Sequence, residues 1–142
     1  MDEEMVLAYY HAGIDCSQVV FGYGAELMGM DRDLACKIAA AFGGGMYHGM
    51  TCGCVTGALM AIGARYGHCR PGDRKTKADL LRVKERFEEQ FIERCGSLVC
   101  KELLGVDVSD DQGKVKAMED NLMDVKCPYF ACIACEIMEG LI

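Results

Sequence analysis

Proline, long hydrophobic runs and strand-like alternation are all scarce in this sequence. Only two of the 142 residues are proline, and no segment alternates polar and apolar residues as a half-buried strand does. The longest apolar run, from Cys52 to Ala64, is rich in glycine and too short to span a bilayer as a helix. These absences favour an all-helical protein and argue against membrane insertion.

Basic residues are also in the minority. The chain has 15 Lys and Arg residues against 22 Asp and Glu residues, for a net charge of −7. No basic stripe with interleaved aromatic residues occurs, so we expect neither nucleic acid nor an anionic membrane as a partner. The start of the chain, Met1-Asp2-Glu3-Glu4, lacks the basic and apolar regions of a signal peptide. We therefore expect a cytoplasmic protein.

Cysteine, by contrast, is abundant, with 10 residues in the chain. In a reducing compartment, such a density is more typical of metal binding or thiol chemistry than of structural disulfides. It also favours an anaerobic host, because exposed thiols oxidise readily in air. The competing interpretation is that individual cysteines are simply small hydrophobic residues of the core.

The hydrophobic patterning predicts a single domain, residues 1–142, folded as a compact all-α bundle of about seven helices. Gly43-Gly44-Gly45 and Pro71-Gly72 interrupt the helical pattern. Thr51 and Ser97 are expected to cap the helices that follow them. No helix is predicted over the polar segment 106–126. The predicted helices cover residues 3–10, 15–27, 31–42, 51–66, 73–95 and 97–105, and a last one starts at 127.

Small residues form one face of the predicted helix 51–66. Gly53, Gly57 and Ala64 lie on this face at helical spacing. Small side chains let the backbone of a second helix approach closely. We expect this face to pack against another helix of the same chain, and a homodimer interface is the alternative.

Four cysteines lie in or beside the first turn of four different predicted helices. Unpaired N–H groups and the helix dipole favour negative charge there, and the thiolate is both the nucleophile and the metal ligand. We therefore predict that at least three of these cysteines lie around one redox or metal site. They are Cys16 after Asp15, Cys52 after Thr51, Cys100 after Ser97, and Cys127 before Pro128.

Cys52 is expected to be the most reactive of these thiols. Gly53 adds no side chain beside it, and the preceding glycine loop offers access to it. His48 precedes the same helix and is a candidate second ligand or charge, although a loop histidine is more often solvated. Against this expectation, Cys52 also belongs to an apolar stripe that could bury its sulfur.

The other motifs in the sequence are weaker evidence for a functional site. Cys132 and Cys135 have the CxxC spacing, but the strand context of a thioredoxin is missing, so core positions are the better interpretation. Glu136 stands where a c-type haem site needs histidine. The tight cysteine runs of ferredoxins are absent, and so are the paired CxxC motifs typical of zinc sites. The Gly43-Gly44-Gly45 loop lacks the lysine of a P-loop.

The four cysteine segments together resemble a family of redox-active proteins described by the pattern C_GCAxxG_C_C. The resemblance extends over nearly the whole chain. It departs from the pattern at Cys54, which stands in place of an alanine. The segments that carry it are Asp15-Cys16-Ser17-Gln18, Phe42-Gly43-Gly44-Gly45 with Cys52-Gly53-Cys54-Val55-Thr56-Gly57, Gly96-Ser97-Leu98-Val99-Cys100, and Cys127-Pro128.

The resemblance implies electron transfer or thiol–disulfide cycling at Cys16, Cys52, Cys100 and Cys127. Members of the family are similar to a domain fused to c-type cytochromes, which implies a redox partner protein. An iron–sulfur centre, with Cys54 as an added ligand, is the cofactor that this similarity suggests, and zinc is less favoured. The alternatives are a non-catalytic metal- or cluster-binding module and a structural subunit with buried thiols. The roles of the additional cysteines stay open; these are Cys36, Cys69, Cys95, Cys132 and Cys135.

Overall fold

The computed structural model describes all residues from 1 to 142 and contains helices but no β-sheet. The predicted all-α fold is confirmed, with nine helical elements in place of about seven. None of these helices combines the length and the apolar character that crossing a membrane requires. The elements are α1 (Glu3–His11), α2 (Cys16–Leu27), α3 (Arg32–Ala39), the short π-helix η1 (Gly45–Gly49), α4 (Gly53–Tyr66), α5 (Arg74–Cys95), α6 (Cys100–Leu104), α7 (Asp111–Glu119) and α8 (Leu122–Leu141).

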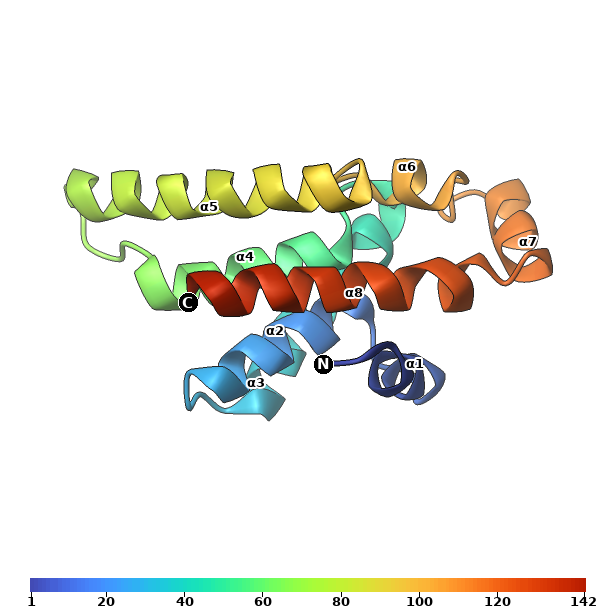
Figure 1. Cartoon of the computed structure of the whole chain (residues 1–142), viewed down its shortest axis with the longest axis horizontal. Coiled ribbons are helices and arrows are strands. Elements are labelled where there is room, and N and C mark those ends of the chain that lie inside the picture. The colour runs from blue at the N-terminus through green and yellow to red at the C-terminus, as the bar shows by residue number, and fades with distance from the viewer.

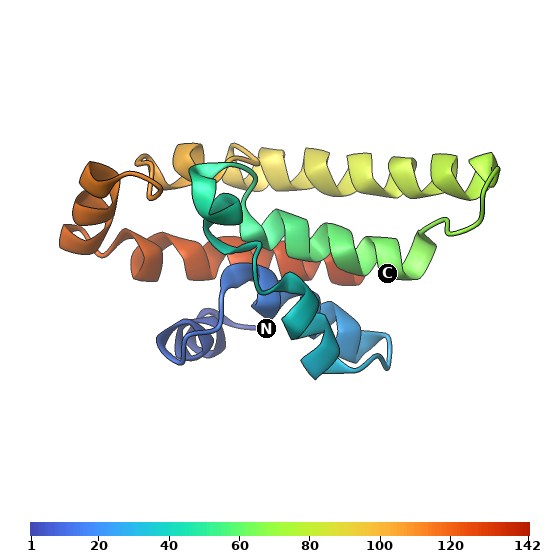
Figure 2. The ribbon, with the colours of Figure 1, turned by 180° about the vertical axis from the view of Figure 1, so that it is seen from behind.

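Three long helices, α4, α5 and α8, lie along the long axis of the molecule (Figure 1). α5 covers one side of the layer that α4 and α8 form, and α1, α2 and α3 lie on its other side, as both views show (Figures 1 and 2). Phe87 and Phe91 of α5, Ile62 of α4 and Met138 of α8 are fully buried between these layers. The short helices α6 and α7 gather at the end of the molecule where α8 begins (Figure 1).

α2 and α4 approach each other closely, as the face of small residues predicts. A Cβ atom added at Gly57 would lie 2.6 Å from the carbonyl oxygen of Ser17 and 3.1 Å from the backbone nitrogen of Phe21, both in α2. Only glycine fits this contact without a shift of one helix. Packing within the chain therefore accounts for Gly57.

The segment 106–126 differs from the prediction because it contains α7. Asp110 caps this helix by accepting a hydrogen bond from the N–H of Gly113. Only Gly113 and Ala117 of α7 are buried. Because these two residues are small and the rest of the helix is exposed, the segment has no hydrophobic stripe from which a helix could be predicted.

The last helix also begins earlier than the sequence predicts. α8 starts at Leu122, so that Cys127 and Pro128 lie within the helix and not at its first turn. A proline inside a helix removes one intrahelical hydrogen bond and costs about 3 kcal/mol. The ring of Pro128 is buried, as are Phe130 and Ala131 after it, and the burial of this stretch offsets that cost.

Two predicted caps are wrong as well. Cys52, not Thr51, occupies the N-cap position of α4, because Thr51 pairs with Val99 in an isolated antiparallel bridge. Val99, not Ser97, is the N-cap residue of α6, and the hydroxyl of Ser97 accepts a hydrogen bond from the Val99 N–H at 3.0 Å. The bridge therefore joins the starts of α4 and α6.

We predict that Gly57→Ala destabilises the fold by about 1–3 kcal/mol, because the added methyl group would overpack the contact between α2 and α4. The matched control is Gly63→Ala in the same helix, where an added Cβ meets nothing within 4 Å. The control should be neutral or slightly stabilising, since alanine is the better helix former. Urea unfolding followed by circular dichroism measures both, and equal effects of the two variants would contradict the proposed close contact.

Candidate functional site

Five cysteines line one pocket, which we call the thiol pocket, with a volume of about 260 Å³. All four cysteines predicted to converge are among them, and Cys54 is the fifth. They come from the starts of α2, α4 and α6 and from the second turn of α8. The cysteines are Cys16, Cys52, Cys54, Cys100 and Cys127, and the other lining residues are Tyr10, Ile14, Asp15, Gly44, Gly53, Leu104, Val108, Met123 and Asp124.

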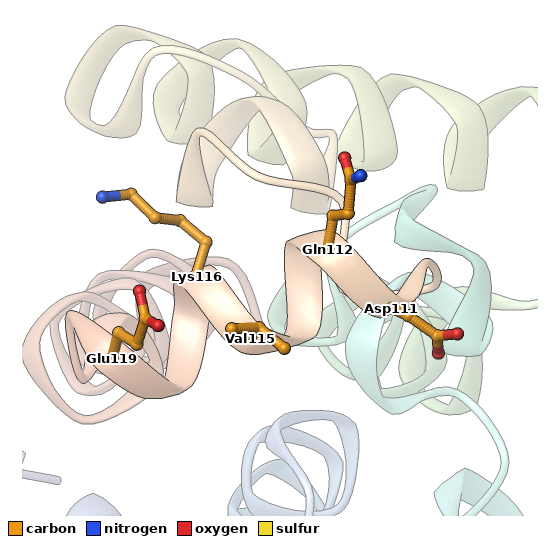
Figure 3. Close-up of a pocket in the computed structure, with 5 residues that line it drawn as sticks. All are labelled: Asp111, Gln112, Val115, Lys116 and Glu119. Atoms are coloured by element: carbon orange, nitrogen blue, oxygen red, sulfur yellow. The ribbon is translucent and has the colours of Figure 1, made fainter.

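Another hollow lies on the surface of α7 (Figure 3). Its five lining residues all belong to this one helix and are all exposed. Lys116, the only cation among them, is paired with Asp120 at 2.7 Å. No thiol and no buried polar group faces this hollow, so the thiol pocket is the candidate functional site.

Gly53 lets the sulfur of Cys16 reach the start of α4. A Cβ atom added at Gly53 would lie only 2.3 Å from the Cys16 sulfur and 3.1 Å from the backbone nitrogen of Ser17. Any side chain at this position would therefore displace the sulfur. The absence of one leaves Cys16 beside the two cysteines that flank Gly53, Cys52 and Cys54.

The loop before α4 closes another side of the pocket. Four consecutive residues of this loop have left-handed backbone conformations, with φ between 58° and 64°: Gly44, Gly45, Met46 and Tyr47. Left-handed backbone costs a non-glycine residue about 1–2 kcal/mol, so this loop stores strain at Met46 and Tyr47. The hydroxyl of Tyr47 donates a hydrogen bond to the carboxylate of Asp15, the N-cap residue of α2.

Cys16 is the one thiol of the pocket whose pKa is lowered. The principal cause is a hydrogen bond between its sulfur and the thiol of Cys54. The backbone N–H groups of Gly44 and Ser17 also donate to the sulfur and lower its pKa further. Burial and the negative charge of Asp15 act in the opposite direction but do not prevail. Half-buried Cys16 is therefore the pocket residue that most readily becomes a thiolate.

Cys54 is the complementary member of this pair. Its hydrogen bonds to Cys16 and to Cys52, together with burial, raise its pKa well above the ordinary value for a thiol. Of this pair, Cys16 is therefore the thiol that ionises first, and Cys54 is the one that keeps its proton and donates. The position at which the sequence departs from the family pattern is the one that stabilises the Cys16 thiolate.

Cys100 and Cys127 line the same pocket but are not activated. Burial, and next the charge of Cys52, raise the pKa of Cys100 to about 12. Burial, and next the charge of Cys16, likewise raise the pKa of Cys127. Cys100 lies at the start of α6, as the sequence predicts, but this helix is only five residues long. Cys127, in contrast, lies inside α8 and not at its start.

Two of the features expected to activate Cys52, a cap by Thr51 and a nearby His48, are not found. Cys52 is buried, and its own N–H donates to the carbonyl of Leu98 at 2.8 Å. Thr51 does not cap the helix, and the exposed His48 does not line the pocket. Asp15 and Cys16, in contrast, start α2 as the sequence predicts.

The five cysteines of the pocket are of the residue type that holds iron–sulfur clusters and zinc. In the structure, however, no group of three or more His, Cys, Asp or Glu side chains is arranged to hold a metal ion. No step of the chemistry below is therefore assigned to a metal.

The remaining cysteines do not line the thiol pocket. Cys132 is half-buried and Cys135 is buried in α8, and burial raises the pKa of both. The sulfur of Cys36 contacts the carbonyl oxygen of Gln18 at 3.7 Å. Burial raises the pKa of Cys95 to about 11, and Cys69 is exposed.

Tyr10 is a pocket residue that no sequence signal marks. It comes from α1, and its hydroxyl is the only buried side-chain polar atom in the structure without a hydrogen-bond partner. Burial raises its pKa well above the ordinary value, and the thiols of Cys54 and Cys16 add to this effect. Tyr10 therefore presents a neutral hydroxyl beside the cysteines.

A comparison with protein families agrees with this arrangement. The model of a family described as "Putative redox-active protein (C_GCAxxG_C_C)" matches residues 14–141, and this range contains all five cysteines of the pocket. No curated protein and no solved structure matches the chain.

We predict that Cys16 is alkylated faster than exposed Cys69 at neutral pH and that its labelling falls only when the pH drops below the ordinary thiol range, because its pKa is lowered. Cys100, with a pKa of about 12, should react slowly over the same range. Iodoacetamide labelling of reduced protein, followed by peptide mass spectrometry, measures each rate.

Cys54→Ala provides the matched variant for this experiment. It removes the hydrogen bond that is the main cause of the low pKa, so the labelling curve of Cys16 should move to higher pH. If Cys16 labels no faster than Cys69, or if the variant leaves its curve in place, the activation of Cys16 by Cys54 is disproved.

Proposed function

The chain belongs to the C_GCAxxG_C_C family, and we propose that it carries out thiol–disulfide redox chemistry at Cys16 and Cys54. In this proposal, Cys16 is the nucleophile and Cys54 is the resolving thiol. The observation that supports it most is the position of the Cys16 sulfur against Gly53, the residue before Cys54. The opposite pKa shifts of the two thiols, lowered for Cys16 and raised for Cys54, agree with this position. A low-pKa thiolate beside a second thiol is the arrangement that dithiol oxidoreductases use.

The first step is an exchange with a substrate disulfide. The Cys16 thiolate attacks one sulfur of the substrate, the substrate S–S bond breaks, and a mixed disulfide forms while one substrate thiolate leaves. In the second step, Cys54 loses its proton and attacks the Cys16 sulfur. The mixed disulfide breaks, the second substrate thiolate leaves, and a Cys16–Cys54 disulfide remains.

One turn of the cycle transfers two electrons from the protein to the substrate and consumes two protons at the substrate sulfurs. The protein dithiol is oxidised to a disulfide, and the substrate disulfide is reduced to two thiols. The proton of Cys16 passes to water when its thiolate forms and that of Cys54 is lost in the second step, and the two substrate thiolates take up two protons from water. A dithiol partner restores the reduced protein by the reverse exchange. The expected redox partner is therefore a thiol compound or protein and not an electron carrier that acts through a metal.

The other thiols of the pocket have supporting roles in this proposal. Cys52 also interacts with Cys54 and is a thiol that could exchange disulfides with the pair. Cys100 and Cys127 stay protonated and keep further negative charge away from the Cys16 thiolate. All ten cysteines are free in the structure, which suits a dithiol resting state in a reducing, cytoplasmic environment.

We predict that mild oxidation of the reduced protein joins Cys16 to Cys54. Peptide mapping without reduction should recover one linked peptide pair with the loss of two hydrogen atoms. Cys16→Ala and Cys54→Ala should each abolish that pair. The double variant Cys132→Ala/Cys135→Ala is the matched control and should retain it, because neither residue lines the thiol pocket.

Metal analysis of protein purified without oxygen distinguishes the alternative function. The proposed cycle predicts colourless protein without stoichiometric iron, zinc or sulfide. A chromophore that disappears in Cys16→Ala would contradict the proposal and favour a cluster-binding module, and a linked pair other than Cys16–Cys54 would contradict the assignment of the resolving thiol.

A further inference from the structure

The hydroxyl of Tyr10 is a buried polar group of the thiol pocket that the proposed cycle does not yet use. A hydroxyl buried without a hydrogen bond is costly, and native structures rarely keep one without a function. Tyr10 lines the pocket, and the groups that influence its ionisation are the thiols of Cys54, Cys16, Cys127 and Cys52. Its free hydrogen bond is therefore available beside the reacting sulfurs.

The charges around the pocket restrict what the ligand can be. Asp15 and Asp124 line it, and no lysine, arginine or histidine does. Asp15 accepts a hydrogen bond from Tyr47, and Asp124 contacts the exposed His11 at 2.9 Å. An anion inside the pocket would meet two carboxylates and the Cys16 thiolate. Two lysines lie close by but outside it: Lys114 lines the adjoining hollow, and Lys126 donates to the backbone carbonyl of Leu104 at 3.2 Å.

The size and the polarity of the pocket also restrict which ligands can bind. The pocket volume of about 260 Å³ corresponds to a small molecule. Its apolar walls consist of Ile14, Leu104, Val108 and Met123. A polar group of the ligand therefore has few partners besides Tyr10 and the two carboxylates.

We infer that the thiol pocket binds a small uncharged or cationic disulfide, and that the Tyr10 hydroxyl donates a hydrogen bond to the sulfur that leaves. This inference rests on the proposed thiol–disulfide cycle and names its substrate class. When the Cys16 thiolate attacks, negative charge passes from Cys16 to the departing sulfur. A donor placed beside that sulfur stabilises the charge, and the leaving thiolate then takes its proton from water.

The first experiment tests Tyr10 with two uncharged disulfides that differ in their leaving groups. Hydroxyethyl disulfide releases a basic thiolate, whereas dithiodipyridine releases a stable thiopyridone that needs little assistance. Tyr10→Phe should slow formation of the Cys16–Cys54 disulfide by about tenfold or more with hydroxyethyl disulfide, the effect of one hydrogen bond to a charged group, and by no more than about twofold with dithiodipyridine. Rapid acid quench and mass spectrometry measure both rates.

Tyr23→Phe is the matched control, because the hydroxyl of Tyr23 bonds to Glu139 outside the pocket and its removal should change neither rate. Equal slowing of Tyr10→Phe with both probes would indicate a structural effect and overturn the role of Tyr10, as would no slowing with either. If no probe produces a Cys16–Cys54 disulfide even in the unchanged protein, the proposed function itself fails.

The second experiment tests charge selection with three disulfides of similar size. Cystamine is cationic, hydroxyethyl disulfide is neutral and dithiodipropionate is anionic. Added salt should slow the reaction of cystamine, accelerate that of dithiodipropionate and leave the neutral probe unchanged, because the carboxylates attract the first and repel the second. Asp124→Asn should weaken both salt effects. Rates that do not depend on salt for either charged probe would overturn the charge selection.

Discussion

The close approach of α2 to α4 is the constraint on which the rest of the site depends. Two glycines of α4 make it possible, since side chains at Gly53 and Gly57 would collide with the Cys16 sulfur and with the backbone of Ser17. The same contact therefore packs the core and brings a thiol of one helix against the first turn of another. The stability of the fold and the placement of the thiols are coupled here through shared backbone positions.

This contact also determines how charge is divided among the thiols. A single negative charge is favourable on Cys16, where the Cys54 thiol and the N–H groups of Gly44 and Ser17 point to it. The other pocket thiols with altered pKa values, Cys54, Cys100 and Cys127, are all shifted towards the protonated form. The pocket thus concentrates thiols while avoiding the repulsion that several buried thiolates would create.

Much of the fold could be predicted from local signals, whereas the pairing within the site could not. Asp15 before Cys16 and the Gly43-Gly44-Gly45 loop mark real boundaries. Pro128 predicts a helix start at Cys127, because proline favours the first helical position, but burial along α8 outweighs this preference. The contact between Cys16 and Cys54, and the position of Tyr10, depend on how distant helices pack, and no local pattern encodes that.

The central claim is that Cys16 and Cys54 act as one unit, with the thiolate on Cys16 and the proton on Cys54. NMR titration of protein labelled at the cysteine β-carbons tests it most directly, because it follows the ionisation of each residue separately. The account predicts that Cys16 titrates below the ordinary range of a free thiol, while Cys54 remains protonated to higher pH. Titration of Cys16 and Cys54 together, within the ordinary range of a free thiol, would contradict it.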